Sequence, residues 1–181
     1  MSTKFVLVGV PGIGKTELAT AIAGEIGGSV MGSAPSILSD AAFGALMDYR
    51  DEILLASIRT QLHLLKPNDP SVFDGSLFDS FAHVSINLER MAKYQNVSEQ
   101  TMERTVLAGA LIGSMMTDSV EQDYVFFLER ELEPDLDNEE YLLQNRLRTI
   151  LDAWQVDYMI LREEEKGDWE TQAKETVKLY G

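Results

Sequence analysis

Short apolar runs alternate with longer segments of helical spacing along most of the chain. Four apolar runs have the length of a strand: Phe5–Val8, Ser71–Phe73, Tyr124–Leu128 and Asp157–Leu161. Because they are largely continuous rather than alternating with polar residues, they are typical of parallel strands that are buried on both faces. A brief fifth strand is expected around Val30, inside the turn-rich segment 27–36.

Between these strands, apolar residues recur at three- and four-residue intervals, which predicts helices. The predicted helices run from Lys15 to about Ile26, from Ala41 to Leu65 as one helix or two, from about Leu77 to Tyr94, from Ser98 to about Asp118, from Glu139 to about Trp154 and from about Asp168 to Leu179. Ser98 and Asn138 are expected to cap two of them. This alternation predicts a three-layer α/β fold, in which a mostly parallel central sheet is covered by helices on both faces. Ligands bind such folds at the carboxyl ends of the strands.

The segment between the first strand and the first helix fits a phosphate-binding loop. The pattern G-x-x-x-x-G-K-[ST] is matched by Gly9, Val10, Pro11, Gly12, Ile13, Gly14, Lys15 and Thr16. Its glycines let backbone N–H groups turn inward at the positive end of the helix dipole, which favours phosphate. Lys15 is expected to reach the β- and γ-phosphates of ATP and Thr16 to offer its hydroxyl to Mg²⁺, with Glu17 as the last residue of the nucleotide-binding segment. A glycine-rich turn with a solvated lysine is the alternative.

This loop indicates a P-loop NTPase fold, and the size of the chain agrees with a single domain. The chain has 181 residues, 45 % of them hydrophobic, so we expect one compact domain over residues 1–181. The absence of cysteine excludes disulfides, thiolate zinc sites and cysteine nucleophiles. No apolar run is long enough to cross a bilayer, and the first residues lead directly into the first strand, so we expect a cytoplasmic protein.

The charge of the chain limits its partners. Thirty acidic residues against fifteen basic ones give a formal net charge of −15, which argues against a nucleic-acid polymer and favours a small nucleotide. His63 and His83 have no metal-ligand spacing, so both are interpreted as structural. Three methionines are interpreted as core filling: Met102, Met115 and Met116.

Asp74 provides a second point of chemistry. It ends an apolar strand whose carboxyl end should lie beside the phosphate loop. A carboxylate there could hold a metal-bound water or accept a proton from an attacking hydroxyl. We therefore assign Asp74 to the catalytic residues and, with Thr16, to the Mg²⁺ site. The alternative is a turn that Asp74 begins with Gly75 and that caps the next helix through Ser76; Asp79 is the weaker acidic candidate.

The order of these segments resembles that of the P-loop nucleoside and nucleoside-monophosphate kinases, in particular deoxynucleoside kinases and small bacteriophage deoxynucleotide kinases. The likeness rests on Gly9–Thr16 after a first strand, on Val72–Ser76 after a long helical segment and on Tyr124–Leu128 before a polar segment. It implies ATP and Mg²⁺ as cofactors, Asp74 as the base or metal-site carboxylate, and a mobile lid after the third of these segments. Two features differ from the family: Gly75 stands where an arginine usually follows the acid, and the segment 129–137 is acidic where the family's lid is rich in arginine.

The lid is expected within residues 129–146, with Arg130 as its catalytic cation. A surface salt bridge is the alternative role for Arg130. Arg146 and Arg148 could replace it if the following helix begins the lid, although they point to different faces of that helix and at most one would reach the site.

The phosphoryl acceptor is expected to bind between the loop Gly32–Ser39 and the helix that carries Tyr49, Arg50 and Arg59. Tyr49 could stack on a base, while Arg50 could meet a phosphate or a base edge. For each of these residues, a solvated helix face is the alternative.

Together these features predict a phosphotransferase that moves the γ-phosphoryl group of ATP to a nucleoside or nucleoside monophosphate, with a deoxynucleotide as the favoured acceptor. A nucleotide-dependent regulatory ATPase whose output is a protein contact remains an alternative, because a partner could supply the missing arginine. A kinase for a modified base in DNA, or for another small metabolite, also remains open. The expected partner is a small acceptor rather than a membrane, and a homodimer is compatible with the sequence.

Overall fold

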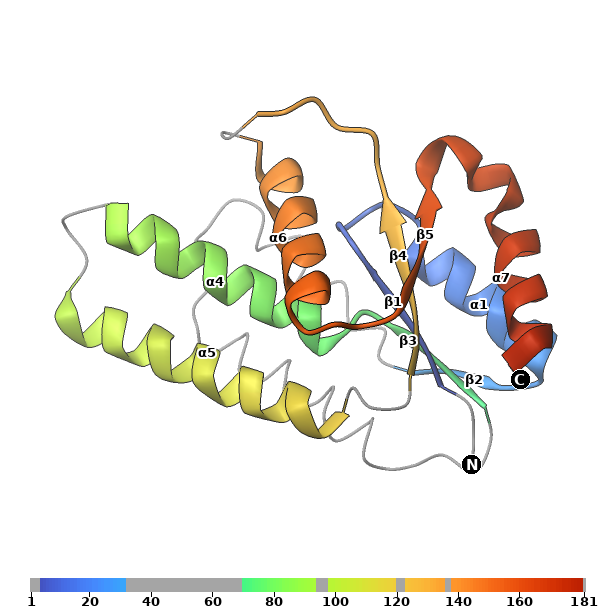
Figure 1. The fold of residues 1–181 in the computed structure, drawn as a ribbon, viewed down its shortest axis with the longest axis horizontal. Helices are drawn as coiled ribbons and strands as arrows, with labels where there is room; N and C mark the ends of the chain where they lie inside the picture. The colour runs from blue at the N-terminus through green and yellow to red at the C-terminus, as the bar shows by residue number, and fades with distance from the viewer. Residues whose placement is uncertain (1–3, 32–69, 94–97, 120–122, 136–137, 181) are drawn as a thin grey trace.

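A five-stranded sheet, parallel throughout, forms the centre of the protein (Figure 1). The structure is a computed structural model that describes residues 4–31, 70–93, 98–119, 123–135 and 138–180. The strands are β1 (Lys4–Gly9), β2 (Ser29–Met31), β3 (Ser71–Asp74), β4 (Asp123–Glu129) and β5 (Tyr158–Arg162). Their order in the sheet is β2-β3-β1-β4-β5, so the phosphate loop leaves the central strand.

Helices cover both faces of this sheet, which confirms the predicted three-layer α/β fold (Figure 1). On one face lie α1 (Lys15–Ile26) and α7 (Lys166–Tyr180). The other face is covered by α4 (Leu77–Lys93) and α6 (Glu139–Ala153), and α5 (Glu99–Ser119) packs against α4. A short 3-10 helix, η1 (Glu163–Glu165), joins β5 to α7.

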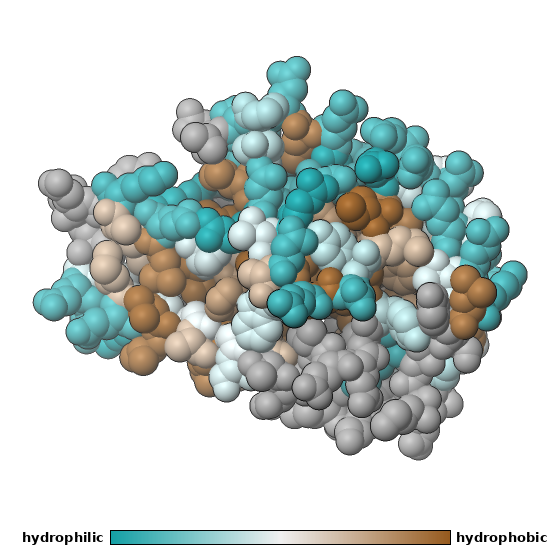
Figure 2. All heavy atoms as spheres, in the orientation of Figure 1, coloured by the Kyte–Doolittle hydropathy of each residue, from teal (hydrophilic) through white to brown (hydrophobic). Residues whose placement is uncertain are grey.

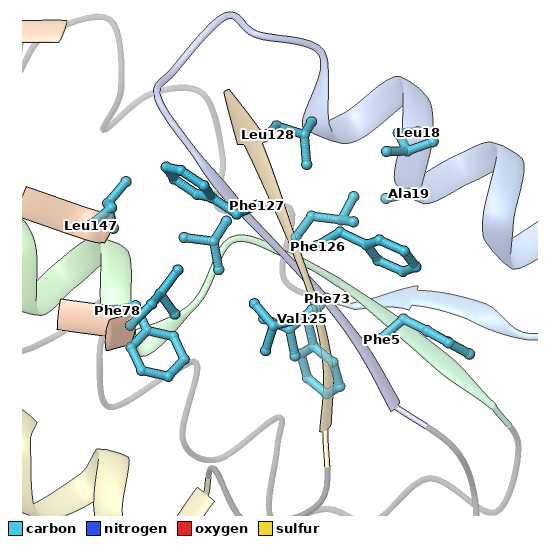
Figure 3. Packing of buried hydrophobic residues seen from close by; sticks show 14 of the residues in the cluster. Phe5, Leu18, Ala19, Phe73, Phe78, Val125, Phe126, Phe127, Leu128 and Leu147 are labelled. Atoms are coloured by element: carbon cyan, nitrogen blue, oxygen red, sulfur yellow. The ribbon is translucent and has the colours of Figure 1, made fainter. Parts of the chain in front are cut away.

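The strands β1 and β4 are almost continuously apolar because both faces of the sheet are buried there. Phe5 and Phe126 on neighbouring strands stack with ring centroids 6.1 Å apart and lie on the side of α1 (Figure 3). Phe127 and Val125 point to the opposite side, towards Leu147 of α6 (Figure 3). Successive residues of one strand therefore enter two different packing layers, so almost every position needs an apolar side chain.

The predicted element boundaries agree with the structure to within about two residues where it describes them. Asn138 caps α6, because its side-chain oxygen accepts hydrogen bonds from the backbone N–H groups of Glu140 at 2.9 Å and Tyr141 at 3.1 Å. Ser98 likewise accepts from the N–H of Thr101 at 3.2 Å. The predicted helix over residues 41–65 lies outside the described residues.

The methionines predicted to fill the core are buried to different degrees. Met116 is completely buried and Met115 packs against the core, as predicted, while Met102 is half-buried. His83 is half-buried on α4, and His63 lies outside the described residues.

The surface is divided between polar and apolar regions (Figure 2). Hydrophilic side chains gather over α6, η1 and α7, whereas apolar ones show at the left over α5. Exposed apolar side chains on α5 are Val106, Leu107 and Leu111. None of the described helices is both long enough and apolar enough to cross a membrane.

Candidate active site

The phosphate loop joins β1 to α1 at the carboxyl end of the sheet (Figure 1). Gly12 has a φ of 75° and Gly14 a φ of 111°, backbone conformations that residues other than glycine rarely adopt. Gly14 is also the N-cap residue of α1. At Gly9 the requirement is space, because a Cβ there would lie 2.8 Å from the backbone oxygen of Leu128 on β4. The glycines of the motif therefore let the loop turn tightly and pack closely on the sheet.

The structure brings three predicted site residues together at this loop. The Lys15 ammonium donates hydrogen bonds to the backbone oxygens of Gly9 and, at 3.0 Å, Val10. The Thr16 hydroxyl donates to Asp74 Oδ2 at 2.5 Å, across 58 positions of sequence. The hydroxyl of Thr16 and the carboxylate of Asp74 thus meet beside the loop whose backbone Lys15 contacts.

The hydroxyl of Thr16 and the carboxylate of Asp74 fit a magnesium site. Both are oxygen donors, and Mg²⁺ is usually held by one or two protein oxygens together with substrate phosphates and waters. Within the described residues, no group of three or more acidic or histidine side chains could hold a metal without such help. The arrangement therefore suits a metal that arrives with a nucleotide.

The backbone explains why no arginine follows Asp74. Gly75 is buried, has a φ of 91° and donates its N–H to the backbone oxygen of Leu7 at 3.2 Å. A side chain at this position would adopt a strained conformation. Glycine thus stands where the kinases usually have an arginine because this backbone conformation lets its N–H bond to β1.

Asp79 has a structural role at the start of α4. Its carboxylate accepts hydrogen bonds from the backbone N–H and the hydroxyl of Ser76, both at 2.7 Å, and the Ser76 hydroxyl accepts from the N–H of Asp79 at 3.3 Å. This reciprocal pattern is a capping box. Ser76 and Asp79 therefore cap the helix. Asp74 takes no part in these cap hydrogen bonds and instead contacts Thr16 at the phosphate loop.

Replacing Ser76 with alanine should lower the free energy of unfolding by about 1–3 kcal/mol, because the cap is lost and a buried carboxylate loses a hydrogen bond. Urea denaturation at pH 7 measures this effect. Ser85→Ala is the matched control. Ser85 lies within the same helix, and its hydroxyl donates a hydrogen bond to the backbone oxygen of Ala82 instead of capping the helix. Equal losses in the two variants would contradict the capping assignment.

Arg130 lies directly after β4 and is held by two carboxylates. Its guanidinium binds Glu163 of η1 through Nε at 2.6 Å and Nη2 at 3.0 Å, and Glu140 of α6 through Nη1 at 2.9 Å. Its backbone N–H and oxygen both pair with the buried amide of Gln144, at 2.8 Å each. These contacts connect the ends of β4 and β5 with α6.

The same network perturbs two pKa values. Hydrogen bonds with Glu163 raise the pKa of Arg130, and those from Arg130 lower the pKa of the Glu163 carboxyl below its ordinary value of 4.5 against the opposing effect of burial. A depressed folded-state pKa means that the ionised carboxylate stabilises the fold above pH 4.5, and that this contribution is lost as the pH falls through the folded value. Arg130 remains charged throughout this range.

Glu163→Gln should therefore destabilise the protein by about 1 kcal/mol at pH 7, a modest value because solvent screens this partly exposed pair. The difference from the unmodified protein should shrink as the pH falls below 4.5. Urea denaturation at pH 7 and pH 3.5 tests this, with the exposed neighbour Glu164→Gln as a control of equal charge change. A deficit that stays constant over this pH range would count against the ion pair.

The other two arginines considered for the lid also contact carboxylates. Arg146 pairs with Glu89 of α4, and Arg148 pairs with Glu129 at the end of β4 while its guanidinium lies 5.9 Å from the ring centroid of Phe127. Of the predicted lid, residues 130–135 have no regular secondary structure and residues 139–146 form the first half of α6. Tyr49, Arg50 and Arg59, predicted to bind the acceptor, lie outside the described residues.

Lys166 lies at the loop although its sequence position suggested no role there. Its ammonium is 3.5 Å from Glu17 Oε2 and 2.9 Å from the point that a Cβ at Gly14 would occupy. It also lies 5.8 Å from the ring centroid of the buried Trp169. No motif or spacing connects a lysine 152 positions after Gly14 with the phosphate loop.

No protein-family model and no curated protein sequence matches the chain. Solved structures do match it: NadR in complex with NR has a TM-score of 0.72 at 13 % identity, over 99 % of this chain and 50 % of that one. Deoxyadenosine kinase from M. mycoides with bound dCTP has a TM-score of 0.68 at 15 % identity, over 97 % of this chain and 100 % of that one. The chain has the fold of the P-loop kinases.

The chain spans about half the length of the NadR chain and corresponds to the whole of the deoxyadenosine kinase. The same kinase with bound dATP matches with a TM-score of 0.62 at 12 % identity, over 97 % of this chain. At these identities the likeness establishes the fold. The predicted resemblance to P-loop kinases is confirmed at that level, and its narrower bacteriophage form stays a prediction.

Proposed function

We propose that the protein is an ATP-dependent phosphotransferase that acts on a nucleoside or nucleoside monophosphate, with a deoxynucleotide as the favoured acceptor. The observation that carries the proposal is the meeting of Lys15, Thr16 and Asp74, in which a hydroxyl and a carboxylate from distant segments lie 2.5 Å apart at a phosphate loop. Structural neighbours with bound dCTP, dATP and NR support an acceptor of this class.

In the proposed reaction a hydroxyl of the nucleoside, or a phosphate oxygen of the nucleoside monophosphate, attacks the γ-phosphorus of ATP. The bond between this phosphorus and the oxygen that bridges it to the β-phosphate breaks, and ADP leaves. Lys15 neutralises charge on the β- and γ-phosphates. Bound Mg²⁺ would supply further charge neutralisation and be held by Thr16 and Asp74. Where the acceptor is a hydroxyl, Asp74 would take its proton, directly or through a water. Tyr49, Arg50 and Arg59 remain our proposals for acceptor binding.

We propose that Arg130 has a structural role, in which it connects η1 with α6, and that it does not contact the transferred phosphoryl group. A catalytic role would require it to leave both Glu163 and Glu140, which together provide three short hydrogen bonds. Bidentate contact of this kind holds a guanidinium firmly in place. The first turn of α6 and the residues after β4 are then fixed to η1.

A second candidate function is a regulatory ATPase whose partner supplies an arginine. It is favoured by the ion pairs of Arg130, Arg146 and Arg148, which engage all three arginines considered for the lid. A partner protein that stimulates ATP hydrolysis in the absence of any small acceptor would support it. The kinase for a modified base in DNA or for another small metabolite, the homodimer and the cytoplasmic location stay predictions.

The proposal is tested by ADP release from Mg·ATP with a panel of deoxynucleosides, deoxynucleoside monophosphates, NR and simple metabolites. We expect acceptor-dependent release with at least one nucleoside or nucleotide, accompanied by the phosphorylated acceptor in equal amount. ATP binding without acceptor-dependent turnover across the panel would reject the kinase function and favour the regulatory one.

A further inference from the structure

Lys166 is the first residue of α7, and its ammonium lies against Gly14 of the phosphate loop. The atoms nearest to the point that a Cβ at Gly14 would occupy are Lys166 Nζ at 2.9 Å, Lys166 Cε at 3.2 Å and Glu17 Oε2 at 3.4 Å. The lysine and its carboxylate partner therefore lie together against the turn that begins α1. Gly14 leaves room for this approach, since a side chain there would displace the ammonium.

The contact between Lys166 and Glu17 is easily exchanged. The two charges are 3.5 Å apart, and their side chains are 47 % and 78 % exposed. Such exposed ion pairs contribute little to stability. An incoming phosphate offers the ammonium a more highly charged acceptor, at a place where inward-turned N–H groups already favour anions. Lys166 can thus leave Glu17 for a ligand without disturbing the fold.

The order of the strands decides which end of a bound nucleotide Lys166 would meet. Asp74 approaches the loop from β3, the neighbour of β1 on one side, whereas Lys166 follows β5, which lies two strands away on the other side. Lys15, Thr16 and Asp74 form the end of the site suited to the γ-phosphate and its metal. With the γ-phosphate at that end, the nucleoside end of the polyphosphate would extend towards β5 and Lys166.

We propose that Lys166 is a further nucleotide-binding residue, whose ammonium exchanges Glu17 for an oxygen of the α-phosphate when the donor binds. The proposal rests on the nucleotide-binding part of the proposed function. It adds a second lysine to the loop from a segment far along the chain, and it gives Glu17 the role of holding that lysine over the loop while the site is empty.

The test is the dissociation constant of Mg·ADP for Lys166→Met, measured by titration calorimetry at low salt. We expect binding to weaken about tenfold, as for the loss of one charge-assisted hydrogen bond. Lys174→Met is the matched control, because Lys174 lies on the same helix and pairs with Glu25 and Glu170. Its affinity should stay within about twofold, and Lys166→Arg should retain most of the affinity.

Two further titrations define the contact. Inorganic triphosphate should lose affinity for Lys166→Met as ADP does, since the proposed contact is with phosphate. Glu17→Gln should tighten ADP binding more in the unmodified background than in Lys166→Met, because only the former has an ammonium to release. Thermal unfolding of each variant would show that the exposed substitutions leave the fold intact.

Three results would overturn the assignment: ADP affinity within twofold of normal for Lys166→Met, an equal loss for Lys174→Met, or a loss for ADP without a loss for inorganic triphosphate. The last would place Lys166 on the nucleoside. If only the kinase function is wrong, the unmodified protein should bind ADP but show no acceptor-dependent turnover. The titrations of the Lys166 variants would then still test the proposed phosphate contact. Absence of ADP binding by the unmodified protein would overturn both.

Discussion

Lys15→Met is expected to lower acceptor-dependent turnover by about 10²–10³-fold, the range seen when a preorganised donor to developing charge is removed. In the structure the ammonium contacts two backbone oxygens of its own loop, those of Gly9 and Val10. Binding of ATP would redirect it from these oxygens to the β- and γ-phosphates. Methionine keeps an unbranched side chain of high helix propensity at the first position of α1 but cannot donate a hydrogen bond.

The measurement for Lys15 combines turnover with the affinity for ATP. A fall in turnover greater than the fall in affinity would show that the lysine acts mainly on the transition state. Lys174→Met again serves as the control for removing one positive charge from the α1 and α7 side of the sheet. Turnover of Lys15→Met within tenfold of normal would be incompatible with the role assigned to the loop.

Asp74→Asn is expected to reduce turnover by about 10²-fold or more, since the substitution removes a negative charge from a group proposed to hold the metal or take a proton. The amide oxygen of asparagine can still accept the hydrogen bond from Thr16, which Asp74 Oδ2 accepts at 2.5 Å. The stability of the variant should therefore change by less than about 1 kcal/mol. An activity loss with intact stability would separate chemistry from folding.

Two measurements distinguish the roles open to Asp74. If it acts through the metal, the Mg²⁺ concentration needed for half-maximal turnover should rise and excess Mg²⁺ should restore part of the activity. If it acts as a base, the acidic limb of the pH–rate profile should disappear instead. Asp152→Asn on α6 is a suitable control, because that exposed carboxylate accepts a hydrogen bond from Tyr158. Nearly normal turnover in Asp74→Asn would exclude both roles.

Much of the fold followed from local patterns because each pattern has a local cause. The runs Phe5–Val8 and Tyr124–Leu128 are apolar on both faces of the sheet. A few consecutive residues are therefore enough to identify each run as a buried parallel strand. Asn138 could be assigned as a cap because a cap acts on N–H groups only two and three residues away. The closing helix begins at Lys166, two residues before its predicted start, since η1 leads directly into it.

The sequence alone could not show which carboxylate lies at the phosphate loop and which one caps a helix. Asp74 ends a buried strand and Asp79 lies five residues later, yet the first contacts Thr16 and the second caps α4. Between them, Gly75 with its positive φ follows the end of the strand, and Ser76 caps the helix that begins at Leu77. For Arg130, two roles remained open because its partners are 10 and 33 positions away.

The sequence by itself determined the phosphate loop, the strands and helices around it, and the two side chains of that loop, Lys15 and Thr16, proposed for phosphate and metal. Those features depend on residue spacing within one turn, one strand or one motif. Only the tertiary structure decided that Arg130 is held by Glu163 and Glu140, and that Lys166 lies over Gly14. These contacts depend on how β5 and α7 pack beside β4 and α1, and long-range packing of this kind leaves no periodic trace in the chain.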